Sequence, residues 1–347
     1  MMDVDTLLIN DYKMISAMSA AERFAAQSLE KIRAYNLRER VFRSFEKKRK
    51  VVAICMVKNE ESYLLEWIAY HRLMGVNGFL IFDNDSTDKT PEILSAMHEA
   101  GVVCAVPWPT VHPYEKQQIS AFANGIRALQ AAKASEWAGF LDVDEFYVSR
   151  RYGTLTSAMQ QMPAADAYHL TWLFYGSSGL ESWTKGLTIE RFLQRATREH
   201  GKNWLSKPLM NLSAVTGHFH HPHNVEMREG SAYLLPNGAI FPGDLPNRNT
   251  EAAKEMAMAK ANSMDDLCIH HYAVRSKEEF SRKVGKGRVN YRINENPLLF
   301  EENEEYFRTH DINDERDEVL LRIAPEVRLE MKKVFDECRL QGLADLP

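Results

Sequence analysis

The chain has 347 residues, of which 45% are hydrophobic and 26% are charged, and its formal net charge at pH 7 is −5. This composition is typical of a folded globular protein and excludes a disordered one. The net charge supplies no overall basic field, so we expect no nucleic-acid partner. The length suffices for one large domain or two ordinary ones.

The cysteines and the apolar runs indicate the compartment. The four cysteines are scattered and form no Cys-x-x-Cys pair: Cys55, Cys104, Cys268 and Cys338. They predict no disulfide framework and favour a reducing environment. No apolar run reaches the ~18 residues of a membrane span, and the acidic N-terminus is unlike a secretory signal. We therefore expect a cytoplasmic protein, with peripheral contact at the inner face of the membrane left open.

Residues 1–48 predict a helical N-terminal extension. Its apolar residues fall on one broad face, and its end is strongly basic, from Arg38 through residues 47–50. A charge run is usually a solvated surface. The alternative is attraction to anionic lipid or to another subunit. The sequence does not choose between them.

From residue 51 to Asp144, apolar runs of strand length alternate with amphipathic helical stretches. This alternation is typical of an α/β fold with a mainly parallel sheet wrapped by helices. Right-handed crossovers bring the carboxyl ends of such strands to one edge, where open α/β sheets bind ligands. The polar residues that follow the strands should therefore face one crevice: Lys58, Asn59, Asp83, Asn84, Asp85, Asp142 and Asp144.

Asp142 and Asp144 end the last of these strands. Residues two apart in an extended chain point to the same side, so both carboxylates can face one cation. Oxygen ligands of this kind suit Mg²⁺ or Mn²⁺, shared with substrate phosphates. The alternative is that the two residues cap the following turn. Neither a Gly-x-Gly-x-x-Gly nor a P-loop motif follows the first strand, so a nucleotide would be held by side chains and a metal.

The second half of the chain carries three further signals. Aromatic residues between 165 and 205 either stack on a sugar or pack in the core. Four histidines occur between His218 and His223, without the partners that a zinc site needs. Finally, Ser276 opens a helix that ends in a cationic stretch able to clamp a diphosphate, or simply favoured by the helix dipole. These cations are Arg282, Lys283, Lys286 and Arg288.

Taken together, these motifs resemble the family 2-like glycosyltransferases, and most closely the branch that includes family 92. The residues that carry the resemblance lie between about 50 and 290: Lys58-Asn59-Glu60, Glu66-Trp67-Ile68, residues 83–88, residues 141–146, and His271-Tyr272 with residues 276–287. The resemblance implies a GT-A (Rossmann-like) fold at residues 49–292, between helical extensions at 1–48 and 293–347. It also implies a nucleotide-sugar donor, a divalent metal and inversion at the anomeric carbon.

By the same resemblance, Asp142 and Asp144 would hold the metal and the donor phosphates, and His271 would be the third metal ligand, although His270 stays an alternative. Asp83, Asn84 and Asp85 would contact the base and ribose beside Lys58 and Asn59. Gln117 would lie on the nucleoside side of the donor. Relatives commonly place a catalytic Asp after an acidic neighbour about 90 residues past the Asp-x-Asp motif. This chain lacks that pair, and Glu226 and Asp244 are the candidates for the base.

We therefore predict a hexosyltransferase-type glycosyltransferase that uses Mn²⁺ or Mg²⁺. Its donor would be a nucleoside diphosphate-sugar, most simply a UDP-sugar, and its acceptor a glycan or glycolipid hydroxyl, in surface polysaccharide or lipopolysaccharide assembly. Two alternatives are kept. One is a non-catalytic nucleotide-sugar-binding module, and the other is a phosphotransferase with Asp142 as the nucleophile.

Overall fold

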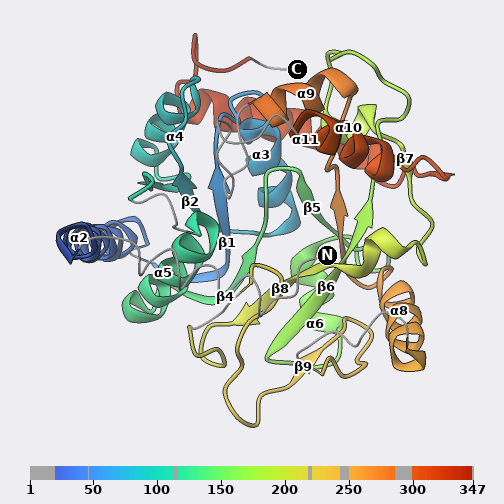
Figure 1. Cartoon of the computed structure of the whole chain (residues 1–347), viewed down its shortest axis with the longest axis horizontal. Coiled ribbons are helices and arrows are strands. Elements are labelled where there is room, and N and C mark those ends of the chain that lie inside the picture. The colour runs from blue at the N-terminus through green and yellow to red at the C-terminus, as the bar shows by residue number, and fades with distance from the viewer. Residues whose placement is uncertain are drawn as a thin grey trace.

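A computed structural model describes residues 20–45, 47–111, 116–217, 221–242, 250–285 and 299–345. Figure 1 shows a curled central sheet with helices on both of its faces. The sheet order is β3-β2-β1-β4-β8-β6-β10-β5, and β9 (Tyr233–Leu234) pairs with β6 at the side. The predicted α/β architecture, with a mainly parallel sheet wrapped by helices, is confirmed.

The first half of the sheet is entirely parallel. Its four strands are β1 (Arg49–Val57), β2 (Gly78–Asp83), β3 (Cys104–Pro107) and β4 (Ser135–Phe140). The connecting helices are α3 (Leu64–Met74), α4 (Thr90–Glu99) and α5 (Gln117–Ala132). Because the strands run the same way, the polar residues that follow them collect at one edge, as the sequence predicted.

The second half of the sheet is mixed. β8 (Ser206–Asn211) runs antiparallel to both β4 and β6 (Ala167–Phe174). β10 (Cys268–His271) is parallel to β6 and antiparallel to β5 (Glu145–Val148). β5 starts directly after the Asp-x-Asp motif, and its register pairs Glu145 with His271. This pairing brings the end of β10 to the two aspartates across more than a hundred residues of sequence.

Side chains of β1 alternate between two cores. Val51 and Ala53 belong to a cluster that includes residues of α3, α4 and α11 (Ala324–Glu337), whereas Val52 and Ile54 belong to a cluster with α2 (Ala20–Ser44) and α5. Such alternation with no polar face is what a strand covered on both sides requires. Burial of both faces makes β1 an interior strand of the sheet, paired with β2 on one side and with β4 on the other.

The remaining elements surround the second half of the sheet and the C-terminal part. They are α6 (Leu155–Gln161), α7 (Thr188–Arg191), β7 (Gln194–Arg195), η1 (Gly201–Trp204), α8 (Glu251–Ser263), α9 (Lys277–Gly285), α10 (Leu299–His310), β11 (Glu315–Arg316) and η2 (Leu321–Ile323). The predicted helices at both ends of the chain are present in the described residues. The domain boundaries at 48 and 292 stay predictions. No helix in the described part of the chain is long and apolar enough to cross a bilayer.

Candidate active site

Asp144 is a buried carboxylate at the edge of the sheet. Its backbone carbonyl accepts a hydrogen bond from the Tyr272 amide at 2.8 Å, and its Oδ1 lies 3.6 Å from His271 Nε2. The Lys283 ammonium donates to its other carboxylate oxygen. Burial raises the pKa of the Asp144 carboxyl, but the positive charges around it, that of Lys283 foremost, outweigh burial, and the pKa lies well below its usual value. The group is a carboxylate at neutral pH.

His271 is held in an aromatic cage at the end of β10. Its ring centroid lies 4.3 Å from that of Trp172 and 4.7 Å from that of Phe174. Burial lowers the pKa of the imidazole to about 4, so it is neutral at pH 7 and keeps a lone pair. His270 points to the other face of the strand and packs on Tyr175. Of the two histidines, His271 is therefore the one beside Asp144.

Asp142 faces different partners from Asp144. Gln118 Nε2 donates to its Oδ1 at 2.8 Å, and Lys207 Nζ donates to its Oδ2 at 2.8 Å. The Asp142 amide donates to Glu145 Oε2, also at 2.8 Å, which closes the turn between β4 and β5. The turn is therefore closed by the Glu145 carboxylate, while the Asp142 carboxylate is held by Gln118 and Lys207.

The loop after β2 is tied to the end of β1. Asn59 has a left-handed backbone (φ 54°), and its Oδ1 accepts from the Thr87 amide at 2.6 Å. Asp85, also left-handed, accepts at Oδ2 from the Thr110 amide at 3.0 Å. Asn84 is buried and donates to the Trp108 carbonyl at 3.0 Å. These side chains hold the loops at the carboxyl ends of β1, β2 and β3 against one another.

Two groups on this edge are poised for a ligand. Gln117, the first residue of α5, is 2% exposed, and neither its amide oxygen nor its amide nitrogen has a hydrogen-bond partner among the described residues. Asp83 Oδ1 is likewise buried without a partner there, and burial raises the pKa of this carboxyl. Unpaired buried polar groups are costly and rare, so they mark positions that a bound molecule can satisfy. Lys58, half-buried, follows β1 directly.

The family model of glycosyltransferase family 92 matches residues 48–233, which contain the parallel half of the sheet and the Asp-x-Asp motif. This chain belongs to glycosyltransferase family 92. A family 92 protein of Oryza sativa subsp. japonica is 30% identical over 197 residues, covering 54% of this chain and 32% of that protein. One of Ricinus communis is 28% identical over 229 residues, covering 62% and 36%. The chain thus spans about a third of the length of these relatives.

Similarity to solved structures is weaker. Residues 1–349 of TarS from S. aureus match with a TM-score of 0.32 and 12% identity, covering 85% of this family 92 chain and 83% of that one. The same protein in complex with UDP matches with a TM-score of 0.29 and 13% identity, covering 84% and 74%. These scores are too low to support any inference about the site, which is therefore described from its own residues.

Lys207 is the functional-site residue that sequence reasoning on this family 92 chain missed. It lies on β8, its side chain is 1% exposed, and its Nζ is 3.5 Å from Glu145 Oε2 as well as 2.8 Å from Asp142. Despite burial, the two carboxylates hold the pKa of Lys207 above its usual value. The only signal in the sequence was a lysine in a short strand-like run, and a charge buried in a strand must be paired.

Arg275 forms a second wall of the site. Its guanidinium lies 3.5 Å above the Tyr63 ring and 3.9 Å from Glu60, and it contacts the Val143 carbonyl between the two aspartates. Tyr63 in turn donates to Glu279 Oε1 at 2.8 Å. Ser276 opens α9 as predicted and forms a capping box with Glu279, because the Ser276 hydroxyl and the Glu279 carboxylate accept from each other's backbone amides.

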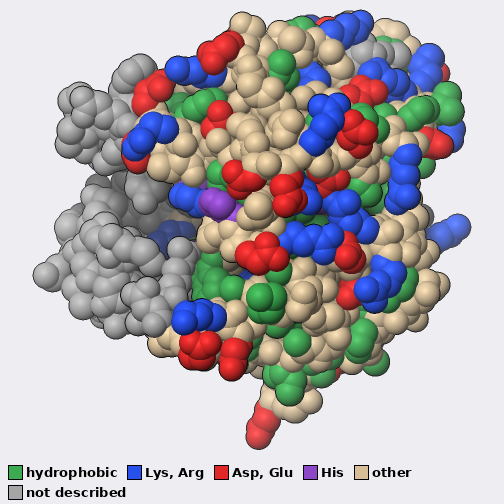
Figure 2. Space-filling view, turned by 90° about the vertical axis from the view of Figure 1, so that its right-hand side faces the viewer, with side chains coloured by type: hydrophobic (Ala, Val, Ile, Leu, Met, Phe, Trp, Pro, Cys, Tyr) green, Lys and Arg blue, Asp and Glu red, His purple; other side chains and the backbone are tan. Residues whose placement is uncertain are grey.

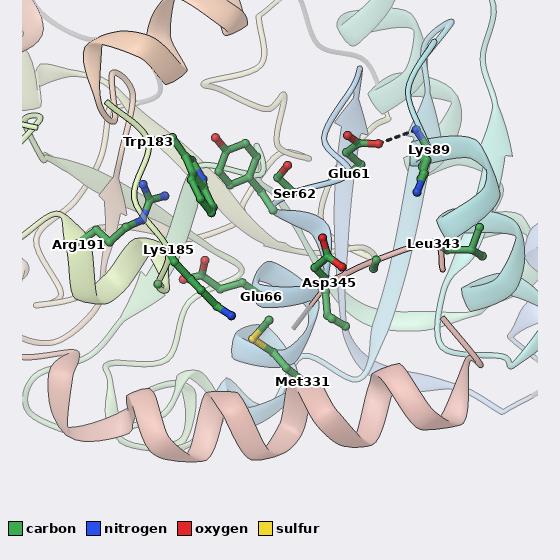
Figure 3. Close-up of a pocket in the computed structure, with 14 residues that line it drawn as sticks. Glu61, Ser62, Glu66, Lys89, Trp183, Lys185, Arg191, Met331, Leu343 and Asp345 are labelled. Atoms are coloured by element: carbon green, nitrogen blue, oxygen red, sulfur yellow. Dashed lines mark hydrogen bonds between the residues drawn. The ribbon is translucent and has the colours of Figure 1, made fainter. Parts of the chain in front are cut away.

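Behind Tyr63 lies a cavity of about 480 Å³, which Figure 3 shows between the start of α3 and α11. Trp183 forms one side of it, and Lys185 reaches into it opposite Asp345. Neither Asp142 nor Asp144 lines this cavity, and the Tyr63–Arg275 layer separates them from it. The aromatic residues, for which the sequence left core packing and sugar stacking open, differ in burial. Trp172, Phe174 and Tyr175 are buried in the core, whereas Trp183 is exposed.

The remaining predicted residues lie apart from this centre or outside the described residues. Glu226 is exposed, and its carboxylate accepts from the Thr216 hydroxyl at 3.1 Å. Asp244, Lys286 and Arg288 lie outside the described residues, as do two of the four clustered histidines, His218 and His220. His221 and His223 pack on each other with a centroid distance of 4.6 Å, and His223 also packs on Trp172 with a centroid distance of 4.8 Å. The catalytic base therefore stays a prediction.

The donor set fits a divalent cation in part. Among the described residues, no three His, Cys, Asp or Glu side chains are arranged to hold a metal on their own. Asp144 and His271 nevertheless offer a carboxylate and a neutral imidazole 3.6 Å apart. Mg²⁺ commonly takes one or two protein ligands and completes its shell with water and substrate phosphates. The site fits such a shared ion, provided that Lys283 gives up its bond to Asp144.

Proposed function

We propose that this protein transfers a sugar from a nucleoside diphosphate-sugar to an acceptor hydroxyl, with a divalent metal and with inversion at the anomeric carbon. One observation carries the proposal: a buried carboxylate and a neutral imidazole meet at the edge of the sheet where the loops after β1 and β2 also lie. Membership of family 92 supports the reaction class. The metal is inferred from the site together with the family resemblance, whereas the stereochemistry and the substrates come from the resemblance.

The nucleoside would lie between the start of α5 and the loops after β1 and β2, which Asn59 ties together. Asp83 and Gln117 each bring a buried polar atom without a partner among the described residues, and base and ribose groups can satisfy them. Lys58, Asn84 and Asp85 line or support the same edge. UDP is our proposed nucleotide.

The diphosphate would lie over Asp144. A cation bound by Asp144 and His271, with Asp142 beside them, would offset the negative charge that develops on the departing diphosphate. Lys283, now on Asp144, would turn to the phosphates, because a phosphate oxygen offers it the same charge-assisted bond. Lys286 and Arg288 are the predicted further members of this clamp.

The acceptor hydroxyl would attack from the side of the sugar opposite the diphosphate. A carboxylate must take its proton, and Glu226 and Asp244 stay our candidates. The acceptor is proposed to be a glycan or glycolipid of surface polysaccharide or lipopolysaccharide assembly, and the location to be cytoplasmic. The alternative of a non-catalytic binding module is kept because no catalytic base is assigned. Among the described residues no contact favours a phosphotransferase, and the Asp142 carboxylate, its proposed nucleophile, is held in an ion pair with the buried Lys207.

The deciding experiment is a thermal-shift screen of UDP-, GDP- and CMP-sugars with and without Mn²⁺, followed by a donor-consumption assay. We expect one donor to raise the melting temperature only when Mn²⁺ is present, and slow hydrolysis of that donor without acceptor. Donor binding without any turnover would favour the alternative of a non-catalytic binding module. Equal shifts with and without metal would remove the metal from the proposal.

A further inference from the structure

The outer face of α2 is unusually apolar. Leu29, Ile32, Tyr35 and Phe42 are each more than half exposed. The other large hydrophobic side chains exposed in the described part of the chain are scattered over separate segments, at Trp183, Ile240, Met258 and Leu329. Half of these exposed groups therefore lie on one helix, although single exposed apolar residues are normal and need no explanation.

The inner face of α2 packs on the rest of the protein, so the position of the helix is fixed and its outer face is exposed in that position. Leu37, Val41 and Phe45 are buried at intervals of four residues against the cluster that includes α5. Arg33 donates to the Pro109 carbonyl at 2.8 Å, and Arg40 donates to the Ala105 carbonyl at 2.7 Å. At 100° per residue, Ile32, Tyr35 and Phe42 then lie on the side opposite this docked face.

Cations flank the apolar stripe, and the carboxylate between Tyr35 and Phe42, Glu39, pairs with Arg43 at 3.7 Å. Among the side chains described in α2 and in residues 45–50, the exposed charged groups are six cations and two carboxylates: Lys31, Arg38, Arg43, Lys47, Lys48 and Lys50 against Glu30 and Glu39. The face shown in Figure 2, which is opposite α2 in Figure 1, instead mixes acidic and basic side chains. The described part of α2 and the residues that follow it thus expose more cations than carboxylates.

A groove connects this surface to the donor edge. It has a volume of about 720 Å³ and runs between α2 and residues 106–111. Leu29, Ile32 and Tyr35 line it together with Pro107 and Pro109. Its other end includes Thr110, whose amide bonds Asp85 on the proposed donor loop. A molecule held along α2 would thus lie next to the site.

We propose that this face of α2 docks on an anionic lipid bilayer. Leu29, Ile32, Tyr35 and Phe42 would enter the boundary between headgroups and acyl chains, and the flanking cations would contact lipid phosphates. This pairing of an apolar stripe with basic edges is what an interfacial helix requires. A second copy of the chain is disfavoured as the occupant, because two such helices would oppose their cationic edges. The proposal does not depend on the sugar chemistry.

The test is cosedimentation of the full chain with vesicles of phosphatidylcholine alone and of phosphatidylcholine mixed with phosphatidylglycerol. We expect binding to the mixed vesicles that falls with added salt, and little binding to the neutral ones. The stripe variant Ile32→Ser/Tyr35→Ser/Phe42→Ser should lose this binding. The charge variant Arg38→Gln/Arg43→Gln/Lys47→Gln should lose on the order of a hundredfold, since each basic side chain contributes roughly fivefold near an anionic surface.

The matched control is Met258→Ser/Leu329→Ser, which removes exposed apolar side chains from α8 and α11 and should bind like the wild type. Circular dichroism and light scattering of every variant report folding and oligomeric state. Vesicle binding that the stripe variant retains, or that only removal of residues 1–19 abolishes, would overturn the proposal. So would a wild-type dimer that the stripe variant converts to a monomer, because the face would then belong to a second copy.

Discussion

The two aspartates of the motif sit two residues apart and are held in opposite ways. Asp142 is paired with Lys207, whose side chain is 1% exposed on a central strand. Asp144 is paired with Lys283, whose side chain is 43% exposed near the end of α9. The first pair is built into the sheet, whereas the second can open to solvent without disturbing the core. The comparison teaches that Asp144 is the carboxylate free to exchange its partner for a ligand, and Asp142 is the one that fixes the turn.

Asp144→Asn gives the largest expected effect. The change keeps the shape of the side chain but removes the charge that would bind the cation, so donor turnover should fall on the order of a thousandfold. Mn²⁺-dependent donor binding should disappear with it in calorimetry. Asp336→Asn, in a surface ion pair of α11, is the control and should leave both unchanged. Full turnover by Asp144→Asn in metal-free buffer would contradict the proposed role.

Lys207→Met should show that the Lys207–Asp142 pair contributes more to stability than the Lys283–Asp144 pair. It leaves Asp142 and the buried Glu145 without their cation, so we expect a loss of about 3–5 kcal/mol in the free energy of unfolding. The parallel change Lys283→Met removes an exposed partner and should cost no more than about 1 kcal/mol. Urea unfolding of the two variants measures both. Equal losses would remove the distinction between a fixed and an exchangeable pair.

The Glu279 carboxylate, which accepts a hydrogen bond from Tyr63 beneath Arg275, should make the free energy of unfolding depend on pH. Burial raises the pKa of this carboxyl, but hydrogen bonds from Arg191 and Ser276 outweigh burial and lower it from 4.5 to about 2. Its contribution, on the order of 3 kcal/mol, is therefore present above pH 4.5 and lost as the pH falls toward 2. Glu279→Gln should be destabilised at pH 7 by a similar amount, and the gap to the wild type should close in acid. A gap independent of pH would contradict this.

Gln117→Leu gives the smallest expected effect and the most specific one. The variant removes an amide that has no partner among the described residues, so the stability of the donor-free protein should stay equal or rise slightly. Donor affinity should fall about tenfold if this amide bonds the nucleoside. Gln118→Leu is the contrast, because Gln118 bonds Asp142 and its loss should lower stability. Unchanged donor affinity in Gln117→Leu would remove it from the donor site.

The parallel half of the fold and its polar edge were predictable from the sequence alone. Apolar runs such as residues 51–57 are continuous, and the residues that end them are polar, so local pattern was enough to place Asn59, Asp85 and Asp144 on one edge. The place of His271 beside Asp144 came from a family resemblance rather than from local pattern. The structure agrees with it, because the antiparallel pairing of β5 and β10 sets that contact.

Only the tertiary structure decided which charge meets which. Lys207 reaches Asp142 because β8 is inserted antiparallel beside β4, a pairing between segments about 70 residues apart that leaves no mark on either sequence. The unequal roles of Asp142 and Asp144, the stacking of Arg275 on Tyr63 and the outward face of α2 arise in the same way. Sequence pattern determines which side chains lie on which face of a strand or helix. The energies of buried charges depend on what packs against that face, and only long-range packing sets it.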